Sequence, residues 1–398
     1  MNTLELKNRI QELSLRYFDD TLALRRHLHQ FPELSGEEHA TAAFVAAFLD
    51  SYGIKSKMYI QNTAVVALIE GKEPHSRVVA LRADMDALPI EENNTWEFRS
   101  KYAGIMHACG HDVHVASLLI TARILQELKT EWKGSVKLVF QPSEEKFPGG
   151  AIQLIEAGVL ENPKVDMMLG MHVSPEIDTG KIGMKSGNYM ASTDEIYITA
   201  IGKGGHAAIP EMVVNPLLIA SKILTQLEIF CRDYAPKDTK SVLTFGHILG
   251  SGKTNIIPDK VSLEGTLRTF DEDFRTEAHQ LIAEIASETA KKAGGSAKIS
   301  IDKGYPALYN DEALTKKVFS IAQDLLGEKN VLSLDYRMTA EDFAYYSHRV
   351  PSVFYRLGVG IEGKSCNLHS PDFFVNEDAM QQAPAVMAYM AIELLCEK

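Results

Sequence analysis

The stretch that decides the fold is RVVALRADMDALP, residues 77–89. Its core, from Val78 to Leu81, is continuously apolar, which is typical of a strand buried on both faces of a sheet. A helical stretch follows at about residues 112–128, and another strand-like run lies at 135–140. Strands that alternate with helices in this way predict an α/β unit with a largely parallel sheet.

The same alternation continues on both sides of that stretch. We expect further strands at about 63–69, 165–169 and 352–357, and helices at about 151–156 and 312–326. Near the start of the chain, Ser35-Gly36-Glu37-Glu38 has the spacing of a capping box. That spacing predicts a helix that begins there and runs through Leu49.

The order of elements changes after about residue 188. The expected elements are a strand (194–201), a helix (216–230), two strands (241–248 and 260–270), a helix (272–292) and a strand (297–302). This β-α-β-β-α-β order is that of a ferredoxin-like unit. The sequence therefore predicts a discontinuous catalytic domain, residues 1–187 and 304–398, whose mixed, largely parallel sheet is flanked by helices. An inserted ferredoxin-like domain would span residues 188–303.

Composition excludes several classes of protein. The net charge of −12 argues against a nucleic-acid partner, because phosphate binding needs clustered lysine and arginine. No apolar run is long enough to predict a membrane span, and residues 1–20 lack the hydrophobic stretch of a signal peptide. The four cysteines show no disulfide-framework spacing, so we expect reduced thiols and a cytoplasmic protein.

The densest chemical signal is MHACGHDVH, residues 106–114. A single buried histidine is usually a hydrogen-bonded core residue. Several histidines, a cysteine and an aspartate packed so closely along the chain are hard to explain as core packing. Cysteine and histidine are the side chains that bind borderline-soft divalent metals, so the cluster predicts a metal site.

Ionisable residues are expected to follow four of the predicted strands. Taken singly, the adjacent glutamates are more often a solvated pair, and each histidine is more often structural. Ligands bind at the carboxyl ends of strands in open α/β sheets, so the joint pattern predicts one site. The residues are Asp84 and Asp86 after the strand at 77–83, Glu144 and Glu145 after 135–140, His172 after 165–169, and His369 after 352–357.

The motifs MHACGHD, PSEE, GMH and NLHSP, with GKGGHAAIP and GTLRTF between them, resemble the dinuclear metallo-amidohydrolase and metallopeptidase family. That family includes aminoacylases, hippurate hydrolases, auxin-conjugate hydrolases, N-acetyldiaminopimelate deacetylases and related carboxypeptidases. The resemblance runs along nearly the whole chain and keeps the order of the motifs. It is specific for the family and only weakly specific for the substrate.

The resemblance implies a role for each matching residue. Cys109 matches the ligand that bridges two divalent metal ions. The remaining protein ligands match His111, Glu145, His172 and His369. Glu144 matches the general base, and Asp86 matches the carboxylate that orients a ligand. Asp84 stands where wider-family members carry a metal-binding histidine. The metal stays open among zinc, manganese, cobalt and nickel.

Three residues of the expected inserted domain also match the family. GKGGH, residues 202–206, presents His206 on a glycine-rich loop. The resemblance implies that this histidine reaches the partner subunit's active site and helps to hold the oxyanion, so we expect a homodimer through the inserted domain. Asn255 and Arg268 match positions that contact the substrate carboxylate. Without the resemblance, His206 is an ordinary loop residue and Arg268 a surface residue on a strand.

These parts suit amide hydrolysis. Two metals about 3.5–4 Å apart polarise a carbonyl and lower the pKa of a bridging water, and a glutamate beside a ligating glutamate can carry the water's proton to the leaving amine. We therefore expect cleavage of a small N-acyl amino acid. The nearest alternative is a dipeptidase or carboxypeptidase with the same machinery. A non-catalytic interaction protein is disfavoured, because Glu144 accompanies all five candidate ligands.

A nucleotide-binding protein is the remaining alternative, because two segments are rich in glycine. GSGKT, residues 250–254, would need glycine in place of His247 to complete a phosphate-binding loop. GVGIEG, residues 358–363, has the dinucleotide-binding spacing after a strand, but we expect a loop and no helix behind it. Both segments therefore lack the context that phosphate binding needs.

Overall fold

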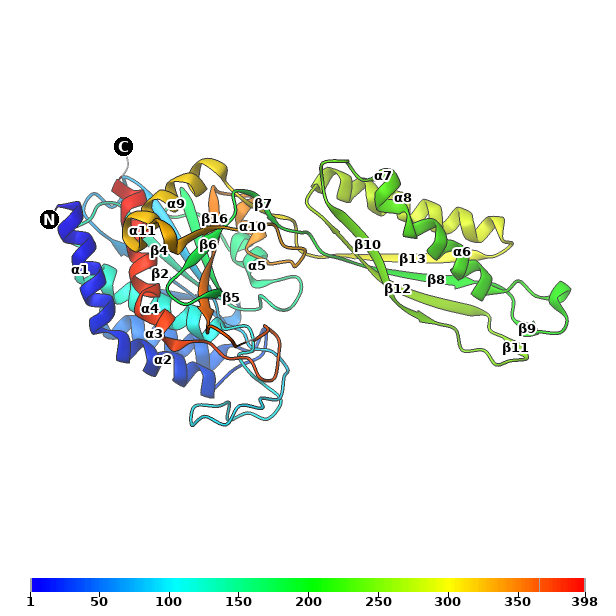
Figure 1. Ribbon diagram of the computed structural model, residues 1–398, viewed down its shortest axis with the longest axis horizontal. Coiled ribbons are helices and arrows are strands. Elements are labelled where there is room, and N and C mark those ends of the chain that lie inside the picture. Colours follow the sequence, from blue (N-terminus) through cyan, green and yellow to red (C-terminus); the bar gives the residue numbers. More distant parts are fainter. Residues whose placement is uncertain (1, 365, 397–398) are drawn as a thin grey trace. The chain divides into compact units, whose positions relative to one another are not determined.

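The computed structural model describes residues 2–364 and 366–396 (Figure 1). The chain folds into two compact units. Unit 1 comprises Met1–Tyr189, Tyr309–Asp335 and Asp342–Lys398, and unit 2 comprises Met190–Leu308 and Tyr336–Glu341. The short segment Tyr336–Glu341 joins unit 2 through backbone pairing, because the Ala191 N–H donates to the Arg337 carbonyl.

An eight-stranded sheet with the order β1-β2-β4-β3-β5-β16-β6-β15 forms the centre of unit 1. The neighbours β4, β3, β5 and β16 are parallel, whereas β1, β2 and β6 pair antiparallel with their inner neighbours, so the mixed, largely parallel sheet is confirmed. The strands of unit 1 are β1 (Ser56–Tyr59), β2 (Ala64–Glu70), β3 (Val78–Asp84), β4 (Ser135–Gln141), β5 (Met167–Asp178), β6 (Ile182–Met184), β7 (Gly187–Met190), β14 (Leu308–Asn310), β15 (Val331–Ser333) and β16 (Ser352–Gly360).

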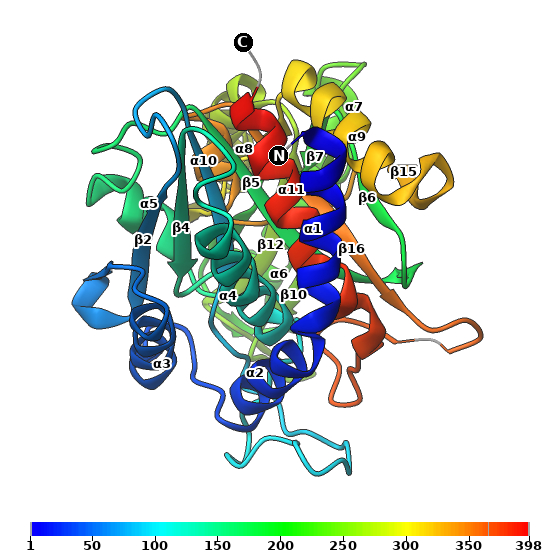
Figure 2. The same ribbon diagram turned by 90° about the vertical axis from the view of Figure 1, so that its left-hand side faces the viewer.

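Helices cover both faces of this sheet (Figure 2). One layer consists of α1 (Thr3–Arg16), α2 (Phe18–Gln30), α3 (His39–Ser51), α4 (His111–Glu127), α9 (Glu312–Leu326) and α11 (Ala383–Cys396). The other face carries α5 (Gly150–Glu156) and α10 (Ala344–Ser347). Because both faces are covered, all seven residues of β3 are buried, as its apolar run predicted.

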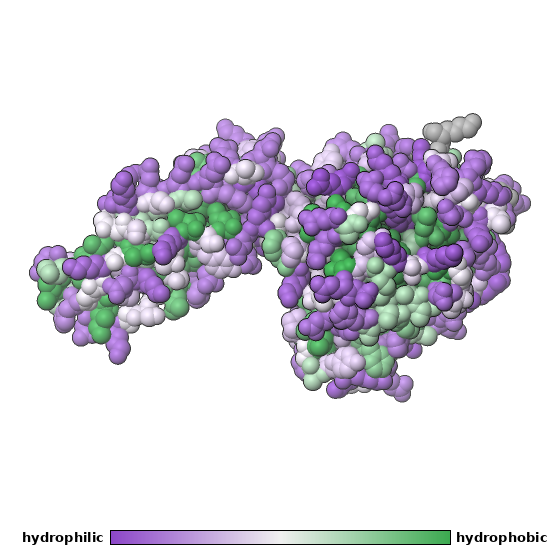
Figure 3. Space-filling model, turned by 180° about the vertical axis from the view of Figure 1, so that it is seen from behind, coloured by the Kyte–Doolittle hydropathy of each residue, from purple (hydrophilic) through white to green (hydrophobic). Residues whose placement is uncertain are grey.

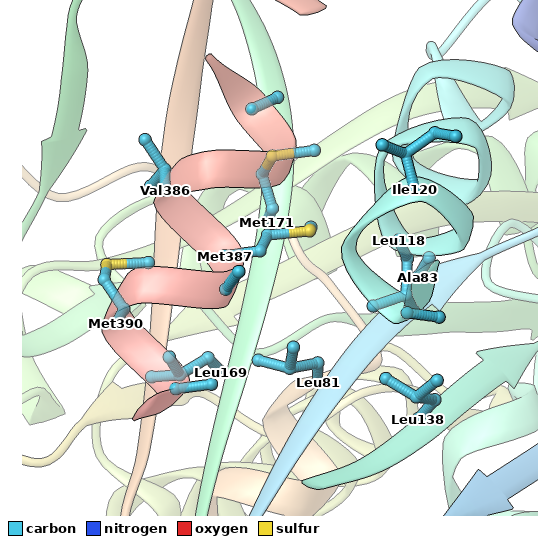
Figure 4. Close-up of a cluster of buried hydrophobic side chains, with 14 of the residues drawn as sticks. Leu81, Ala83, Leu118, Ile120, Leu138, Leu169, Met171, Val386, Met387 and Met390 are labelled. Atoms are coloured by element: carbon cyan, nitrogen blue, oxygen red, sulfur yellow. The ribbon is translucent and has the colours of Figure 1, made fainter. Parts of the chain in front are cut away.

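The main core lies between the sheet and the helices α4 and α11 (Figure 4). Leu81 of β3 and Leu169 of β5 are buried there beside Met387 of α11 and Leu118 of α4. Helix α4 is buried along almost its whole length. Since α4 begins at His111, this packing fixes the position of the metal-capable segment that precedes it.

Unit 2 contains a four-stranded antiparallel sheet with the order β10-β12-β8-β13, which matches the ferredoxin-like pattern. Every second residue of β8 is buried, because α6 and α8 cover one face of the sheet. Its elements are β8 (Asp194–Ile201), β9 (Gly205–His206), α6 (Pro216–Glu228), α7 (Phe230–Tyr234), β10 (Ser241–Leu249), β11 (Ile256–Ile257), β12 (Lys260–Thr269), α8 (Glu272–Lys292) and β13 (Ser296–Lys303).

Short 3-10 helices complete the chain: η1 (Ile60–Asn62), η2 (Pro210–Met212), η3 (Glu328–Asn330) and η4 (Glu377–Gln381). Among the described residues, no helix combines the length and apolarity that crossing a membrane requires. The two rejected glycine segments lead into β11 and into the loop before η4, and neither opens an α-helix.

Candidate metal centre and active site

A tight turn places Cys109 and His111 on the same side of the sheet edge. Gly110, between them, is the N-cap of α4 and has a left-handed backbone with φ of 83°. A Cβ atom at Gly110 would lie 2.5 Å from Cγ2 of Val173, so only glycine fits here. The sequence Cys-Gly-His therefore lets a loop thiol and the first residue of a helix face one point.

The first group of ligand atoms comes from Cys109, His111 and His172. The Cys109 Sγ atom lies 3.3 Å from His172 Nε2. His111 Nδ1 lies 2.9 Å from the Asp86 carbonyl oxygen, which leaves Nε2 to face the cluster. That Nε2 atom is buried and has no hydrogen-bond partner among the described residues. A buried, unpartnered nitrogen beside a thiol is what a divalent metal ion would satisfy.

The second group consists of Cys109, Glu145 and His369, so it shares the thiol with the first. His369 Nε2 lies 3.1 Å from Glu145 Oε1. The backbone of His369 has φ of 60°, a conformation that non-glycine residues rarely adopt, and its N–H donates to the Ala108 carbonyl at 2.8 Å. That bond ties the loop of His369 to the segment of Cys109.

Asp86 contacts one candidate ligand of each group, His111 and Glu145. Its Oδ1 atom lies 3.2 Å from His111 Nδ1. Its Oδ2 atom accepts hydrogen bonds from the Glu145 backbone N–H at 2.9 Å and from the Ser35 hydroxyl at 2.7 Å. The carboxylate therefore orients one candidate ligand by its ring and another by its backbone, which is how outer carboxylates tune metal sites.

Glu144 is buried beside the candidate ligands. It follows Ser143, whose φ of 55° turns the chain sharply after β4. One carboxylate oxygen of Glu144, one of Glu145 and a ring nitrogen of His111 all lie within 4.8 Å of one another. The two adjacent glutamates thus both reach the cluster, and a proton acceptor stands next to a candidate ligand.

The electrostatics of the cluster favour a bound cation. Burial, followed by the carboxylates of Glu145 and Glu144, raises the pKa of the Cys109 thiol well above its ordinary value. Burial opposes the charged form of His111, but the carboxylates of Asp84 and Asp86 outweigh it and raise the pKa of His111 to about 10. Such a site stabilises positive charge, and a divalent ion would supply the charge that keeps the thiol deprotonated.

Asp84 and His114 lie beside the cluster, but their polar atoms have other partners. His114 Nδ1 lies 2.5 Å from one Asp84 oxygen, and His114 Nε2 accepts the Val173 N–H at 2.9 Å. The other Asp84 oxygen accepts from Arg82 at 2.6 Å. Ligand atoms of Asp84, His111 and His114 also lie within 4.8 Å of one another, but these hydrogen bonds occupy both ring nitrogens of His114, so its ring orients Asp84.

His172 was expected to follow a strand, and that prediction is wrong. Strand β5 continues to Asp178, so His172 lies inside it, paired in register with Arg356 of β16. The pairing with β16 extends β5 beyond the point where its own sequence suggested an end. The His172 ring still reaches Cys109, because its Nδ1 lies 2.8 Å from the Val173 carbonyl oxygen and its Nε2 faces the thiol.

The predicted capping box is also wrong. Helix α3 begins at His39, and neither Ser35 nor Glu38 caps it by a side-chain bond. Glu38 instead accepts the N–H groups of Gly36 and Ser143 at 2.9 and 2.8 Å. It is fully buried, and burial together with Asp86 raises its pKa to about 7. Glu38 therefore holds the turn that leads to Glu144, and Ser35 holds Asp86, roles that the local pattern concealed.

The other three candidate residues belong to unit 2. His206 is exposed on β9, and its Nδ1 accepts the Ala208 N–H at 3.1 Å. Asn255 lies next to it, because its carbonyl accepts the Ala207 N–H at 3.1 Å. Arg268 lies apart on β12 and donates to the Thr266 hydroxyl and the Leu267 carbonyl. The structure brings His206 and Asn255 together, and it places Arg268 in another sheet.

Comparison with known proteins identifies the family. The model of peptidase family M20/M25/M40 matches residues 80–393. The chain is 38% identical to the N-acetyl-L-cysteine deacetylase of Bacillus subtilis (strain 168), over 98% of this chain and 92% of that protein. It is 36% identical to the IAA-amino acid hydrolase ILR1-like 2 of Arabidopsis thaliana, over 100% of this chain and 90% of that one.

A solved structure supports the same conclusion. The YXEP protein of Bacillus subtilis, described as a dinuclear metal-binding peptidase of the M20 family, superposes with a TM-score of 0.80 at 31% identity. The match covers 96% of this chain and 99% of that one. The sequence resemblance is thus confirmed, and with it a hydrolase that acts on amide bonds. The chain belongs to peptidase family M20/M25/M40.

Proposed function

We propose that the protein hydrolyses the amide bond of small N-acyl amino acids and releases a carboxylic acid and a free amino acid. The observation that carries this proposal is a thiol shared by two groups of ligand atoms, with Glu144 beside them. The names of the deacetylase and the IAA-amino acid hydrolase both describe the removal of a group from an amino acid. Their similarity to this chain over nearly its whole length supports the same substrate class.

The proposed cofactor is a pair of divalent ions, and zinc, manganese, cobalt and nickel are all compatible with these ligands. Cys109, His111 and His172 would hold one ion, and Cys109, Glu145 and His369 the other. Bound there, the ions would polarise the substrate carbonyl and lower the pKa of the attacking water. A free Cys109 thiol at the centre of the site also suits a reducing compartment, and we propose a cytoplasmic location.

Glu144 is the proposed general base and general acid. Its carboxylate takes the proton of the attacking water and then delivers it to the nitrogen of the leaving amine, so no net proton is consumed by the enzyme. Glu144 is buried close to His111 of the first ligand group and to Glu145 of the second. Asp86 holds the His111 ring and the Glu145 backbone in place during these steps.

We further propose that the protein acts as a homodimer through unit 2. Hydrophobic side chains gather on the face of unit 2 seen in Figure 3. A surface of this kind is typical of a protein contact. In such a dimer, His206 would help to hold the oxyanion in the partner's site, and Asn255 and Arg268 would bind the substrate carboxylate. The large exposed apolar residues of unit 2 are Tyr197, Ile209, Met212, Leu217, Leu218, Tyr234, Ile248, Leu249, Ile256 and Tyr336.

A peptidase with the same machinery is the second candidate, because the solved relative is described as a peptidase. The two candidates differ in the acyl part of the substrate that they cleave off. A simple acetyl or benzoyl group carries no charge there, whereas a dipeptide carries a free amino group. The same residues could serve both, so substrate preference decides between them.

A hydrolysis panel tests the proposal. Metal-loaded protein is given N-acetyl and N-benzoyl amino acids and the matching dipeptides, and release of the free amino acid is measured. We expect kcat/KM to be higher for the N-acyl compounds. The Glu144→Gln protein, purified in the same way, controls for a contaminating hydrolase. A preference for dipeptides would favour the second candidate, and cleavage of neither class by metal-loaded protein would refute both.

A further inference from the structure

His29 lies on the face of α2 that packs against α4, the helix that begins at the candidate ligand His111. The side chain is fully buried. It belongs to none of the groups that could hold a metal among the described residues. A buried polar side chain so far from any candidate ligand in the sequence requires an explanation of its own.

Both ring nitrogens of His29 face carboxylates. Nδ1 lies 2.8 Å from Asp112 Oδ2, and Nε2 lies 3.1 Å from Glu92 Oε1. Ionised carboxylates only accept hydrogen bonds, so each ring nitrogen of His29 is placed to donate to one of them. Arg25 adds a positive charge, with Nε 2.8 Å from the same Asp112 oxygen. His29 therefore bridges two acidic groups in the interior.

The first of these groups leads to His111. Asp112 is the second residue of α4 and follows His111 directly. It is fully buried, so its hydrogen bond to His29 and its ion pair with Arg25 attach the first turn of α4 to α2. A shift of that turn would displace the His111 Nε2 atom, which faces the cluster with no partner among the described residues.

The second group leads to the loop of His369. Glu92 organises residues 92–100, because it accepts hydrogen bonds from Asn94 Nδ2 at 3.1 Å and from the Ser100 N–H at 2.7 Å. Asn94 Nδ2 also donates to the Phe373 carbonyl at 2.9 Å. The Asn93 N–H donates to the Pro371 carbonyl at 3.0 Å. These bonds hold the backbone that comes just after His369.

We propose that His29 is a positioning residue that fixes both ligand-bearing segments from one point: the start of α4 through Asp112, and the loop of His369 through Glu92 and Asn94. The inference rests on the proposed assignment of His111 and His369 to different ions. It adds that the two ions share an outer support in addition to the shared thiol. Outer partners of this kind typically change metal affinity by about 10–100-fold.

Two substitutions separate the two branches. The amide nitrogen of asparagine stands close to the place of Nδ1, and that of glutamine close to the place of Nε2. His29→Asn should therefore keep the bond to Asp112 and lose the bond to Glu92, whereas His29→Gln should do the reverse. Zinc-loaded protein is mixed with a chromogenic chelator, and the release rates of the two ions are followed. His172→Ala and His369→Ala identify which phase belongs to which ion.

We expect His29→Gln to speed release of the ion at His111 by about 10–100-fold and to leave the ion at His369 within twofold of wild type. His29→Asn should give the opposite pattern. His27→Gln is the matched control, because His27 lies on the same helix, stacks on Phe44 and is exposed. It should leave both rates unchanged. A merely structural role would speed both phases equally in both His29 variants, and that result would overturn the proposal, as would two unchanged rates.

If the His29 variants do not fold, Asn94→Ala tests the proposal instead. It breaks only the second branch at a half-buried site, so only the ion at His369 should leave faster. Wild-type release of that ion would overturn the proposal. The proposed function fails differently: wild-type protein would then hold two ions and cleave none of the N-acyl substrates, whatever the release rates of the variants.

Discussion

Glu144→Gln is expected to lower kcat by about 10²–10⁴ while both ions stay bound. The substitution keeps the shape of the side chain and removes its ability to take a proton. Glu144 is buried within reach of the candidate ligands, and its neighbour Glu145 is assigned to a metal. The measurement is single-substrate kinetics together with metal content by mass spectrometry.

Glu145→Gln is the matched control, because it makes the same chemical change one residue away. It should weaken the ion held with His369, whose Nε2 lies 3.1 Å from Glu145 Oε1. Metal content should fall for this variant, and added metal should restore part of its activity. If Glu144→Gln lost metal and Glu145→Gln kept it, the two roles would be reversed.

Mixing two inactive variants is expected to restore about a quarter of wild-type activity if the active site is shared between subunits. His206→Ala should be nearly inactive alone, because losing an oxyanion donor typically costs about 10²–10³ in kcat. Glu144→Gln is inactive for the reason given above. In a mixed dimer, one site combines the intact Glu144 of one subunit with the intact His206 of its partner, and the other site has neither.

Random reassociation makes half of the dimers mixed, and one site in each is intact, which gives the expected quarter. The variants are dissociated, mixed and reassociated, and mixed dimers are confirmed by mass. If His206 acts within its own subunit, every site keeps one lesion and no activity returns. Absence of recovery with mixed dimers present would therefore refute the shared site.

Elements with local signals could be predicted closely from the sequence. Helices α8 and α9 begin and end where expected. Their first turns are capped by Asp271 and Asp311, which accept the N–H groups of Phe274 and Leu314. The central strand β3 was evident because its apolar run is buried on both faces. The family motifs are equally local, since Cys109, Gly110 and His111 form one tight turn.

The errors come from partners that are distant in sequence. Strand β5 runs past His172 because β16 pairs with it, and the Ser35–Glu38 box fails because Asp86 and Ser143 attract its side chains. His29 gave no signal at all, because its partners Glu92 and Asp112 lie 63 and 83 residues away in the chain. Such contacts are fixed by the tertiary fold, and no periodicity or motif records them.

Titrating metal into metal-free protein tests the central claim most directly. The protein is stripped with a chelator, and hydrolysis of an N-acyl amino acid is measured as a divalent ion is added in fractions of an equivalent. Two groups of ligand atoms that share Cys109 predict that activity rises until two equivalents per chain are bound and then stays level. Full activity at one equivalent, or full turnover by the stripped protein, would contradict the account.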